Sequence, residues 1–291
     1  MRNTPHQTGF AQAGDLRIFY RHFASRTART DAGIAGDPLL ILHGLSYFSY
    51  DWIPVASALA EDRDVVAIDL RGFGESDRSP VREYGMRSFA ADGVAVLDHF
   101  GWPRAVLAGH SMGGRIALCT AAWYPDRVSA LVCLDFAPDV AAAGRRNVAL
   151  RIGNQPDAFA SVDHALQYHG YDPAMSADAP LRRRFEAFLE PVAGEYRLKR
   201  DLHFRDTFRE TLATGQPQAA GIDPWSLLAE LAMPLLFVRG RTSDMFAADT
   251  LPKLVAANPR VTTAEIDGGH DLSGDNPEGV VAVVRRFLAA R

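Results

Sequence analysis

The sequence predicts an α/β fold in which a mostly parallel, doubly wound sheet carries an inserted helical lid. Short, continuously apolar runs alternate with helical patterns along most of the 291 residues. Strands that are apolar on both faces belong to a sheet buried between two helical layers, and the helices serve as crossovers between parallel strands. A composition of 47% hydrophobic and 23% charged residues is ample for a large core.

Six apolar runs are predicted to form the strands of this sheet. Each run is short and ends in turn residues, as in "PLLILHG" and "RAVLAGHS". In chain order, the predicted strands cover residues 38–44, 64–72, 104–111, 128–138, 233–241 and 261–270.

Three helices between and after these runs can be read from their spacing and their end signals. Residues 86–100 place apolar side chains at helical spacing, beginning with Phe89. Residues 113–124 follow a glycine-rich turn, and Pro125 ends the helix that they are predicted to form. The last helix begins at Asn276-Pro277, since proline favours the first helical position.

The pattern changes between residues 139 and 228. This stretch is helical and rich in arginine, and it lacks apolar strand runs. We therefore predict that residues 139–228 form a helical cap or lid, and that residues 1–138 and 229–291 form the core. An insertion at the carboxyl edge of a parallel sheet lies over the crevice in which such folds bind ligands.

Composition and charge exclude several classes of partner. The formal net charge is −4, so neither nucleic acid nor an anionic membrane is expected as a partner. The first residues lack the apolar stretch of a signal peptide, and no run approaches the roughly 20 apolar residues of a membrane span. We expect a cytoplasmic protein in which Cys119 and Cys133 are core residues. The sequence specifies no oligomeric state.

The segment "LAGHSMGG", residues 107–114, carries the clearest chemical signal. Gly109, Ser111 and Gly113 form the pattern Gly-x-Ser-x-Gly between a predicted strand and a predicted helix. A serine on so tight a turn needs small neighbours two residues away. The N-terminal N–H groups of the following helix would face an oxyanion formed at this serine. The pattern therefore predicts a nucleophilic serine.

Four motifs in order give the chain a resemblance to the α/β-hydrolase fold family over nearly its whole length. They are "HGLSYFSYDW", "DLRGFGESDRS", "GHSMGG" and "DGGHDLSGDNPEGV". The resemblance implies that Ser111 is the nucleophile and that His270 is the general base. It also implies that the backbone N–H groups of Leu45 and Met112 form the oxyanion hole.

The other histidines are weighed against these roles. His43 and His110 are expected at the substrate site, although His43 is better explained as an orienting hydrogen-bonding group, and His110 is too close to Ser111 in sequence to act as its base. His164, His169 and His203 fall in the predicted lid without cysteine or carboxylate at ligand spacing. No metal or cofactor is implied.

Two aspartates are candidates for the acid of the triad. Asp244 follows the strand at 233–241, where the family most often keeps its acid, but it is the fourth residue after the strand's glycine and the family usually has the acid third. Asp135 lies in "LDFAP", which resembles a subgroup including YbfF-type esterases and 2-(acetamidomethylene)succinate hydrolase, whose acid comes from this earlier strand. We favour Asp135 and retain Asp244 as the alternative.

The predicted function is hydrolysis of a small ester or amide, as by a carboxylesterase, through an acyl-enzyme. Epoxide- and halide-processing members of the family use aspartate at the elbow, and this chain has serine. Arg151 favours a carboxylate-bearing substrate, since it falls where 2-(acetamidomethylene)succinate hydrolase has a carboxylate-binding arginine. The run 182–184 is expected to be a solvated helix face. The alternatives are a C–C hydrolase of vinylogous diketones, a lyase or perhydrolase, and a non-catalytic ligand receptor.

Overall fold

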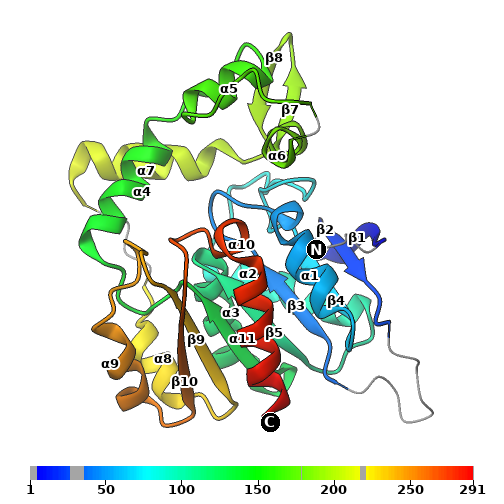
Figure 1. Ribbon diagram of the computed structural model, residues 1–291, viewed down its shortest axis with the longest axis vertical. Coiled ribbons are helices and arrows are strands. Elements are labelled where there is room, and N and C mark those ends of the chain that lie inside the picture. Colours follow the sequence, from blue (N-terminus) through cyan, green and yellow to red (C-terminus); the bar gives the residue numbers. More distant parts are fainter. Residues whose placement is uncertain (1–4, 27–35, 178, 217–220, 291) are drawn as a thin grey trace.

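A central eight-stranded sheet organises the chain (Figure 1). The computed structural model describes residues 5–26, 36–177, 179–216 and 221–290. The first residues of the predicted core, and residues 178 and 217–220 of the predicted lid, lie outside this description. The strand order is β1-β2-β4-β3-β5-β6-β9-β10, so the direction of winding reverses on the two sides of β3. Folds of this kind bind ligands at such a reversal.

All six predicted strands are present, and they pair in parallel with one another. Their continuous apolar character follows from burial on both faces. The strands are β3 (Leu39–Leu42), β4 (Val65–Ile68), β5 (Ala105–His110), β6 (Val128–Leu134), β9 (Leu235–Gly240) and β10 (Val261–Ile266).

Two further strands extend one edge of the sheet, and sequence analysis missed both. β1 (Gln7–Ala13) and β2 (Leu16–Phe23) form an antiparallel hairpin, and β2 pairs antiparallel with β4. In β1 only Ala11 and Ala13 are buried. An edge strand with few large apolar side chains has no apolar run by which to recognise it.

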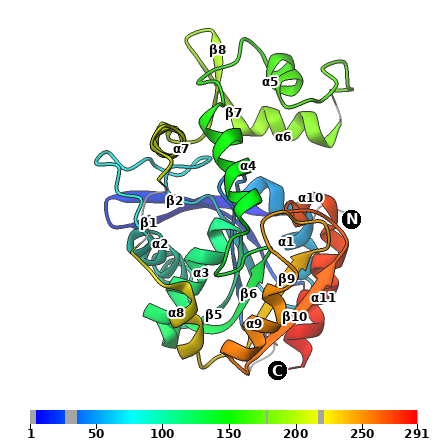
Figure 2. The same cartoon turned by 90° about the vertical axis from the view of Figure 1, so that its left-hand side faces the viewer.

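Helices cover both faces of the sheet (Figure 2). The predicted helices at 86–100, 113–124 and 276–291 correspond to α2 (Met86–His99), α3 (Met112–Trp123) and α11 (Pro277–Ala289). With α2 and α3 on one face lie α8 (Pro224–Glu230) and α9 (Thr250–Ala257), and with α11 on the other lies α1 (Ile53–Leu59).

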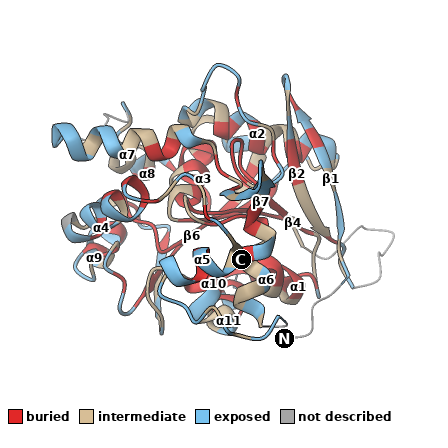
Figure 3. Cartoon of the chain, turned by 90° about the horizontal axis from the view of Figure 1, so that it is seen from above, coloured by how far each residue is buried: buried red, intermediate tan, exposed pale blue. Residues whose placement is uncertain are grey.

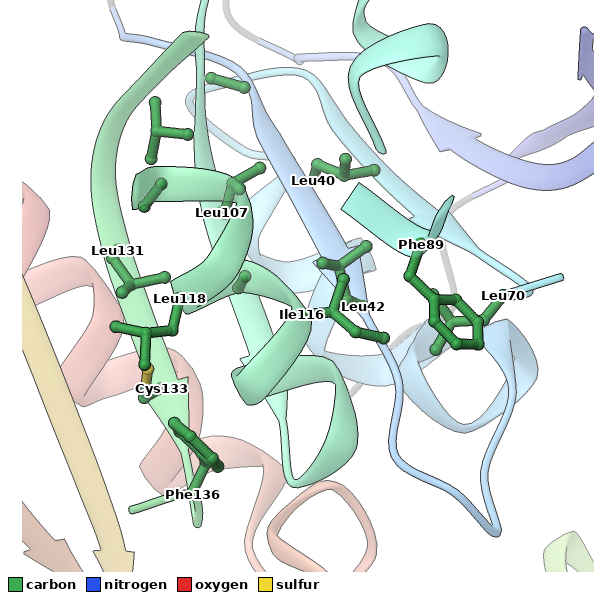
Figure 4. Packing of buried hydrophobic residues seen from close by; sticks show 14 of the residues in the cluster. Leu40, Leu42, Leu70, Phe89, Leu107, Ile116, Leu118, Leu131, Cys133 and Phe136 are labelled. Carbon is green, nitrogen blue, oxygen red and sulfur yellow. The ribbon is translucent and has the colours of Figure 1, made fainter. Parts of the chain in front are cut away.

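Alternate residues of one strand pack on opposite faces of the sheet. Leu40 and Leu42 of β3 pack with residues of α2 and α3, such as Phe89 and Ile116 (Figure 4). Leu39 and Ile41 pack with α1 and α11 on the other face. This period of two is the geometry of a strand buried on both sides. The doubly wound α/β class predicted from the sequence is therefore the observed architecture.

The chain leaves the sheet at the carboxyl end of β6 and builds a separate layer above it (Figures 1 and 3). Its packing centre is a small apolar cluster that includes Phe159, Phe185 and Phe188, and Phe48 of the core joins the same cluster. The elements are α4 (Ala142–Gly153), α5 (Val162–Tyr168), α6 (Pro180–Phe188), β7 (Leu189–Val192), β8 (Glu195–Leu198) and α7 (Leu202–Thr214).

This layer departs from the sequence expectation in two details. It contains the hairpin β7–β8, whose four-residue strands mix polar and apolar residues and so form no apolar run. α8 begins within the predicted range 139–228 and ends two residues beyond it, and its Leu228 packs in the core cluster beside α3. We refer below to residues 139–216 as the insertion. Among the described residues, no helix is long and apolar enough to cross a membrane.

Substitutions in the central strands should destabilise the fold more than substitutions in the edge strand. Phe237 in β9 is fully buried, so Phe237→Ala should lower the free energy of unfolding by about 3–5 kcal/mol through lost burial and a cavity. Phe10 on the edge strand is 41% exposed, and Phe10→Ala should cost no more than about 1 kcal/mol. Urea unfolding measures both, and equal losses would contradict this assignment of the core.

Candidate active site

Ser111 stands on a sharp turn between β5 and α3. Its backbone has φ 53° and ψ −116°, a region that costs an L-residue roughly 1–3 kcal/mol. The flanking glycines are sterically required: a Cβ on Gly113 would lie 2.1 Å from the Leu42 carbonyl oxygen, and one on Gly109 would lie 2.2 Å from that of Gly113. The turn that presents Ser111 is therefore packed too tightly for any side chain at residues 109 and 113.

His270 joins Ser111 from a loop 159 residues further along the chain. The loop lies between β10 and α10 (Leu272–Asp275), and His270 Nε2 is 3.0 Å from Ser111 Oγ. On the opposite side of the ring, Nδ1 is 2.6 Å from Asp135 Oδ2. Because a carboxylate only accepts, Nδ1 carries the proton and Nε2 is left to accept from the serine hydroxyl.

Asp135 is the aspartate that the fold brings to His270. It is 1% exposed, follows β6 with φ 44°, and has a backbone N–H that donates to the Val238 carbonyl at 2.8 Å. Its Oδ1 accepts the Gly240 N–H at 2.9 Å, and its Oδ2 accepts the Ser243 hydroxyl at 2.5 Å. The buried carboxylate is thus satisfied by donors from β9 and the loop after it.

Asp244, the alternative acid, lies elsewhere. Its side chain is exposed and its Oδ2 accepts a hydrogen bond from Asn147 Nδ2 of α4 at 2.8 Å. The one-residue shift seen in the sequence turns Asp244 toward the insertion and points Ser243 at Asp135 instead. Sequence reasoning missed Ser243 as a supporting residue, although its place, third after Gly240, was the available signal.

The segments that carry Leu45 and Met112 meet beside Ser111. Met112 is the first residue of α3, so its N–H has no partner within the helix. The loop after β3 packs on this helix turn, since a Cβ on Gly113 would lie 2.6 Å from the His43 carbonyl oxygen. Leu45 follows two residues later in the same loop. The predicted oxyanion-hole residues therefore belong to adjoining segments.

His43 and His110 are both fully buried, which corrects the expectation that they contact substrate. His43 Nε2 accepts the Leu70 N–H at 2.9 Å, and burial lowers the pKa of His43 to about 3. His110 Nε2 lies 2.7 Å from the His270 carbonyl oxygen, and burial beside His270 lowers the pKa of His110 to about 4. Both are neutral groups that hold loops of the site in place.

A pocket of about 640 Å³, including the space at its open mouth, lies between core and insertion. On the core side it is lined by Ser46, Tyr47 and Asp271, the immediate neighbours of Leu45 and His270. On the insertion side it is lined by Arg151, Ile152, Gln155, His169, Tyr171, Arg184, Phe185, Phe188, Leu198 and Arg200. The pocket thus adjoins, through Ser46 and Asp271, the segments that carry Leu45 and His270, and Arg151 is among its lining residues.

Arg184 corrects the expectation of a solvated arginine run at 182–184. Its Nε donates to Asp51 Oδ1 at 2.5 Å, and its Nη2 donates to the Ser46 carbonyl at 3.3 Å. Asp51 lies on the short helix η1 (Ser49–Trp52) of the core, so this pair connects the insertion to the loop that carries Leu45. Arg182, two residues earlier, pairs within the insertion: its Nη2 lies 2.6 Å from Asp163 Oδ1.

Comparison with known proteins identifies the family to which this chain belongs. A family model described as "alpha/beta hydrolase fold" matches residues 37–277. The chain belongs to the α/β hydrolase fold family. The hydrolase is 28% identical to 2-(acetamidomethylene)succinate hydrolase of Mesorhizobium japonicum, over 92% of this chain and 96% of that protein. It is 27% identical to esterase YbfF of Escherichia coli, over 86% of this chain and 92% of that protein.

A solved structure supports the same fold. The crystal structure of E-2-(acetamidomethylene)succinate hydrolase matches this hydrolase with a TM-score of 0.81 and 24% identity, covering 98% of this chain and 100% of that one. At this identity the match shows a shared architecture, including the layer above the sheet, and leaves the substrate undetermined.

The strained serine leads to a stability prediction. Ser111→Gly relieves the positive φ, whereas Ser111→Ala removes the same hydroxyl but keeps the Cβ and therefore the strain. We expect the glycine variant to be more stable than the alanine variant by about 1 kcal/mol, after the entropy cost of glycine is included. Equal unfolding free energies in urea would show that the turn at Ser111 stores no strain.

Proposed function

We propose that this hydrolase is a serine hydrolase of the carboxylesterase type that cleaves a small ester or amide through an acyl-enzyme on Ser111. The observation that carries the proposal is the continuous hydrogen-bond path from Ser111 Oγ through the His270 ring to the buried Asp135 carboxylate. A serine, a ring nitrogen and a carboxylate in this order are the three groups that acyl transfer to a hydroxyl requires.

In the first half-reaction, His270 Nε2 takes the hydroxyl proton as Ser111 Oγ attacks the substrate carbonyl carbon. Asp135 stabilises the imidazolium that forms, since its carboxylate already accepts from Nδ1. The N–H groups of Leu45 and Met112 are proposed to bind the oxyanion, and one such donor contributes about 3–4 kcal/mol to the transition state. His270 then returns the proton to the leaving alcohol or amine as its bond to the carbonyl carbon breaks.

In the second half-reaction, water replaces the leaving group. His270 Nε2 takes a proton from the water, the hydroxide adds to the acyl carbon, and the bond to Ser111 Oγ breaks as His270 protonates it. The products are a carboxylic acid and the free serine hydroxyl, so the net reaction consumes one water. The neutral tautomer of His270 imposed by Asp135 is the form that starts both halves.

The pocket supports a small substrate that carries a carboxylate. Arg151 lines the pocket and can pair with such a group, as the sequence suggested. One relative is named for 2-(acetamidomethylene)succinate, a small carboxylate-bearing amide, and another is named as an esterase. These names agree with the same chemistry in this chain, where ester and amide differ only in the leaving group.

A fluorophosphonate probe and a panel of short to long acyl p-nitrophenyl esters test the proposal. The wild-type protein should react with the probe at Ser111 and favour short acyl chains, whereas Ser111→Ala should abolish labelling and lower kcat at least about 10³-fold. Mass spectrometry locates the label and absorbance follows p-nitrophenol release. A wild-type protein that neither labels nor turns over any ester would instead support the ligand-receptor alternative.

The two aspartates offer a matched comparison. Asp135→Asn should lower kcat by about 10³–10⁴-fold, because an amide no longer holds His270 in the productive tautomer. Asp244→Asn should change kcat by less than about 3-fold, since the exposed Asp244 carboxylate accepts from Asn147 of the insertion, whereas His270 is hydrogen-bonded to Asp135. Steady-state kinetics on one ester measures both. A collapse of kcat in Asp244→Asn alone would assign the acid to Asp244 and refute the proposed triad.

A further inference from the structure

Arg200 is a buried cation that has no counter-ion in the part of the chain that the structure describes. It follows β8 at the insertion side of the pocket, and its residue is 6% exposed. Among the described residues its guanidinium has one partner, the neutral Gln155, whose Oε1 accepts from Nη2 at 2.7 Å. The Arg200 nitrogens that lack a hydrogen-bond partner retain some exposure to solvent. Because Arg200 lines the pocket, these nitrogens can be reached from it.

Among the described residues, the charged neighbour that acts on Arg200 is another cation, Arg151. Burial and the charge of Arg151 lower the pKa of Arg200 to about 10, which still leaves it protonated at neutral pH. His169 lies beside Gln155, with Nε2 3.4 Å from the amide nitrogen, and burial together with three arginines lowers the pKa of His169 to about 4. This end of the pocket therefore holds fixed positive charge and a neutral imidazole.

The one carboxylate among the residues that line the pocket, within the described chain, belongs to Asp271 on the core side. Its Oδ1 accepts from the Gly274 N–H and from the Ser273 hydroxyl, both at 3.0 Å, so it caps its own helix α10. Arg184, the third arginine of the pocket, is already paired with Asp51. The two ends of the pocket thus differ in charge, and Arg200 and Arg151 are the pocket arginines that pair with no carboxylate of the described residues.

The backbone around Arg200 is held firmly against the core. The Gly74 N–H donates to the Lys199 carbonyl at 2.7 Å, and the Asp201 N–H donates to the Gly72 carbonyl at 2.8 Å. Arg200 itself forms an isolated bridge with Phe73. A guanidinium on an anchored backbone, with Gln155 fixing one edge, is set in position before any ligand arrives.

We propose that Arg200 is the anchor of an anion subsite, where it binds a carboxylate of the substrate remote from the bond that Ser111 attacks. Burying a charge costs free energy unless it is paired, and a ligand carboxylate supplies the missing partner. The planar fork of arginine matches the two oxygens of a carboxylate. This inference rests on the proposed function and specifies its substrate class: a small ester or amide with a carboxylate that reaches the insertion side of the pocket.

The test compares charged and neutral esters of similar length. Monomethyl adipate and methyl hexanoate are presented to wild type, Arg200→Gln, Arg200→Lys and Arg197→Gln, with acid release followed in a pH-stat. Arg197 is the matched control because it lies on β8 but is exposed. We expect Arg200→Gln to lower kcat/KM for the charged ester about 10- to 100-fold with little change for the neutral ester. Arg200→Lys should lose less, and Arg197→Gln should match wild type.

The Gln155→Glu variant distinguishes a ligand-binding role of Arg200 from a purely structural role. The new carboxylate replaces the Oε1 that Arg200 already contacts, so it supplies a counter-ion without changing size. We expect a higher melting temperature together with loss of the preference for the charged ester, because Arg200 would be neutralised internally. A purely structural Arg200 would give the higher melting temperature with the preference unchanged, and that result would overturn the proposal.

Two further outcomes keep this inference distinct from the proposed function. Equal kcat/KM of wild type for the two esters, or equal losses for both in Arg200→Gln, would refute the anion subsite and leave the serine hydrolase proposal intact. If no ester is turned over, calorimetric binding of monomethyl adipate to Ser111→Ala still tests the subsite. Binding should then weaken about 10-fold or more in the Ser111→Ala/Arg200→Gln double variant, and unchanged binding would refute it.

Discussion

The arrangement of the site depends on one buried carboxylate. Asp135 lies at the junction of β6 and β9 and accepts hydrogen bonds from the Gly240 backbone, the Ser243 hydroxyl and the His270 ring. A carboxylate removed from water is tolerated only when its oxygens are satisfied. The same contacts that satisfy Asp135 therefore fix the loop after β9 and the loop after β10, and they set the ring of His270 toward Ser111.

The sheet provides the rigidity that this arrangement needs. Ser111 and Asp135 both have positive φ directly after neighbouring parallel strands, β5 and β6. Such conformations persist only where the surrounding structure imposes them, and here the fully buried strands and the close-packed glycines at 109 and 113 do so. Strain at the two turns is thus the consequence of aiming two polar side chains at one point above the sheet.

The insertion shows how one residue type takes different roles according to its partners. Arg184 pairs with Asp51 and connects the insertion to the core, whereas Arg182 pairs with Asp163 near the surface. Arg200 is as buried as a core residue, but among the described residues its guanidinium pairs only with the Gln155 amide. In a stretch that is uniformly arginine-rich in sequence, the position of the nearest carboxylate distinguishes a structural cation from one available to a ligand.

The fold class and six of the eight sheet strands could be predicted from the sequence, which also predicts Ser111 and His270 as the reactive pair, because apolar runs, helical spacing and the glycine elbow are local signals. It favours Asp135 and retains Asp244 as the alternative acid, since both follow predicted strands and the local sequence does not specify which of them faces His270. The contact of Asp135 with His270, the place of Ser243 and, among the described residues, the lack of a carboxylate partner for Arg200 appear only in the tertiary structure. Each depends on contacts between residues far apart in the chain, 135 residues in the case of Asp135 and His270, and no local pattern encodes which distant groups meet.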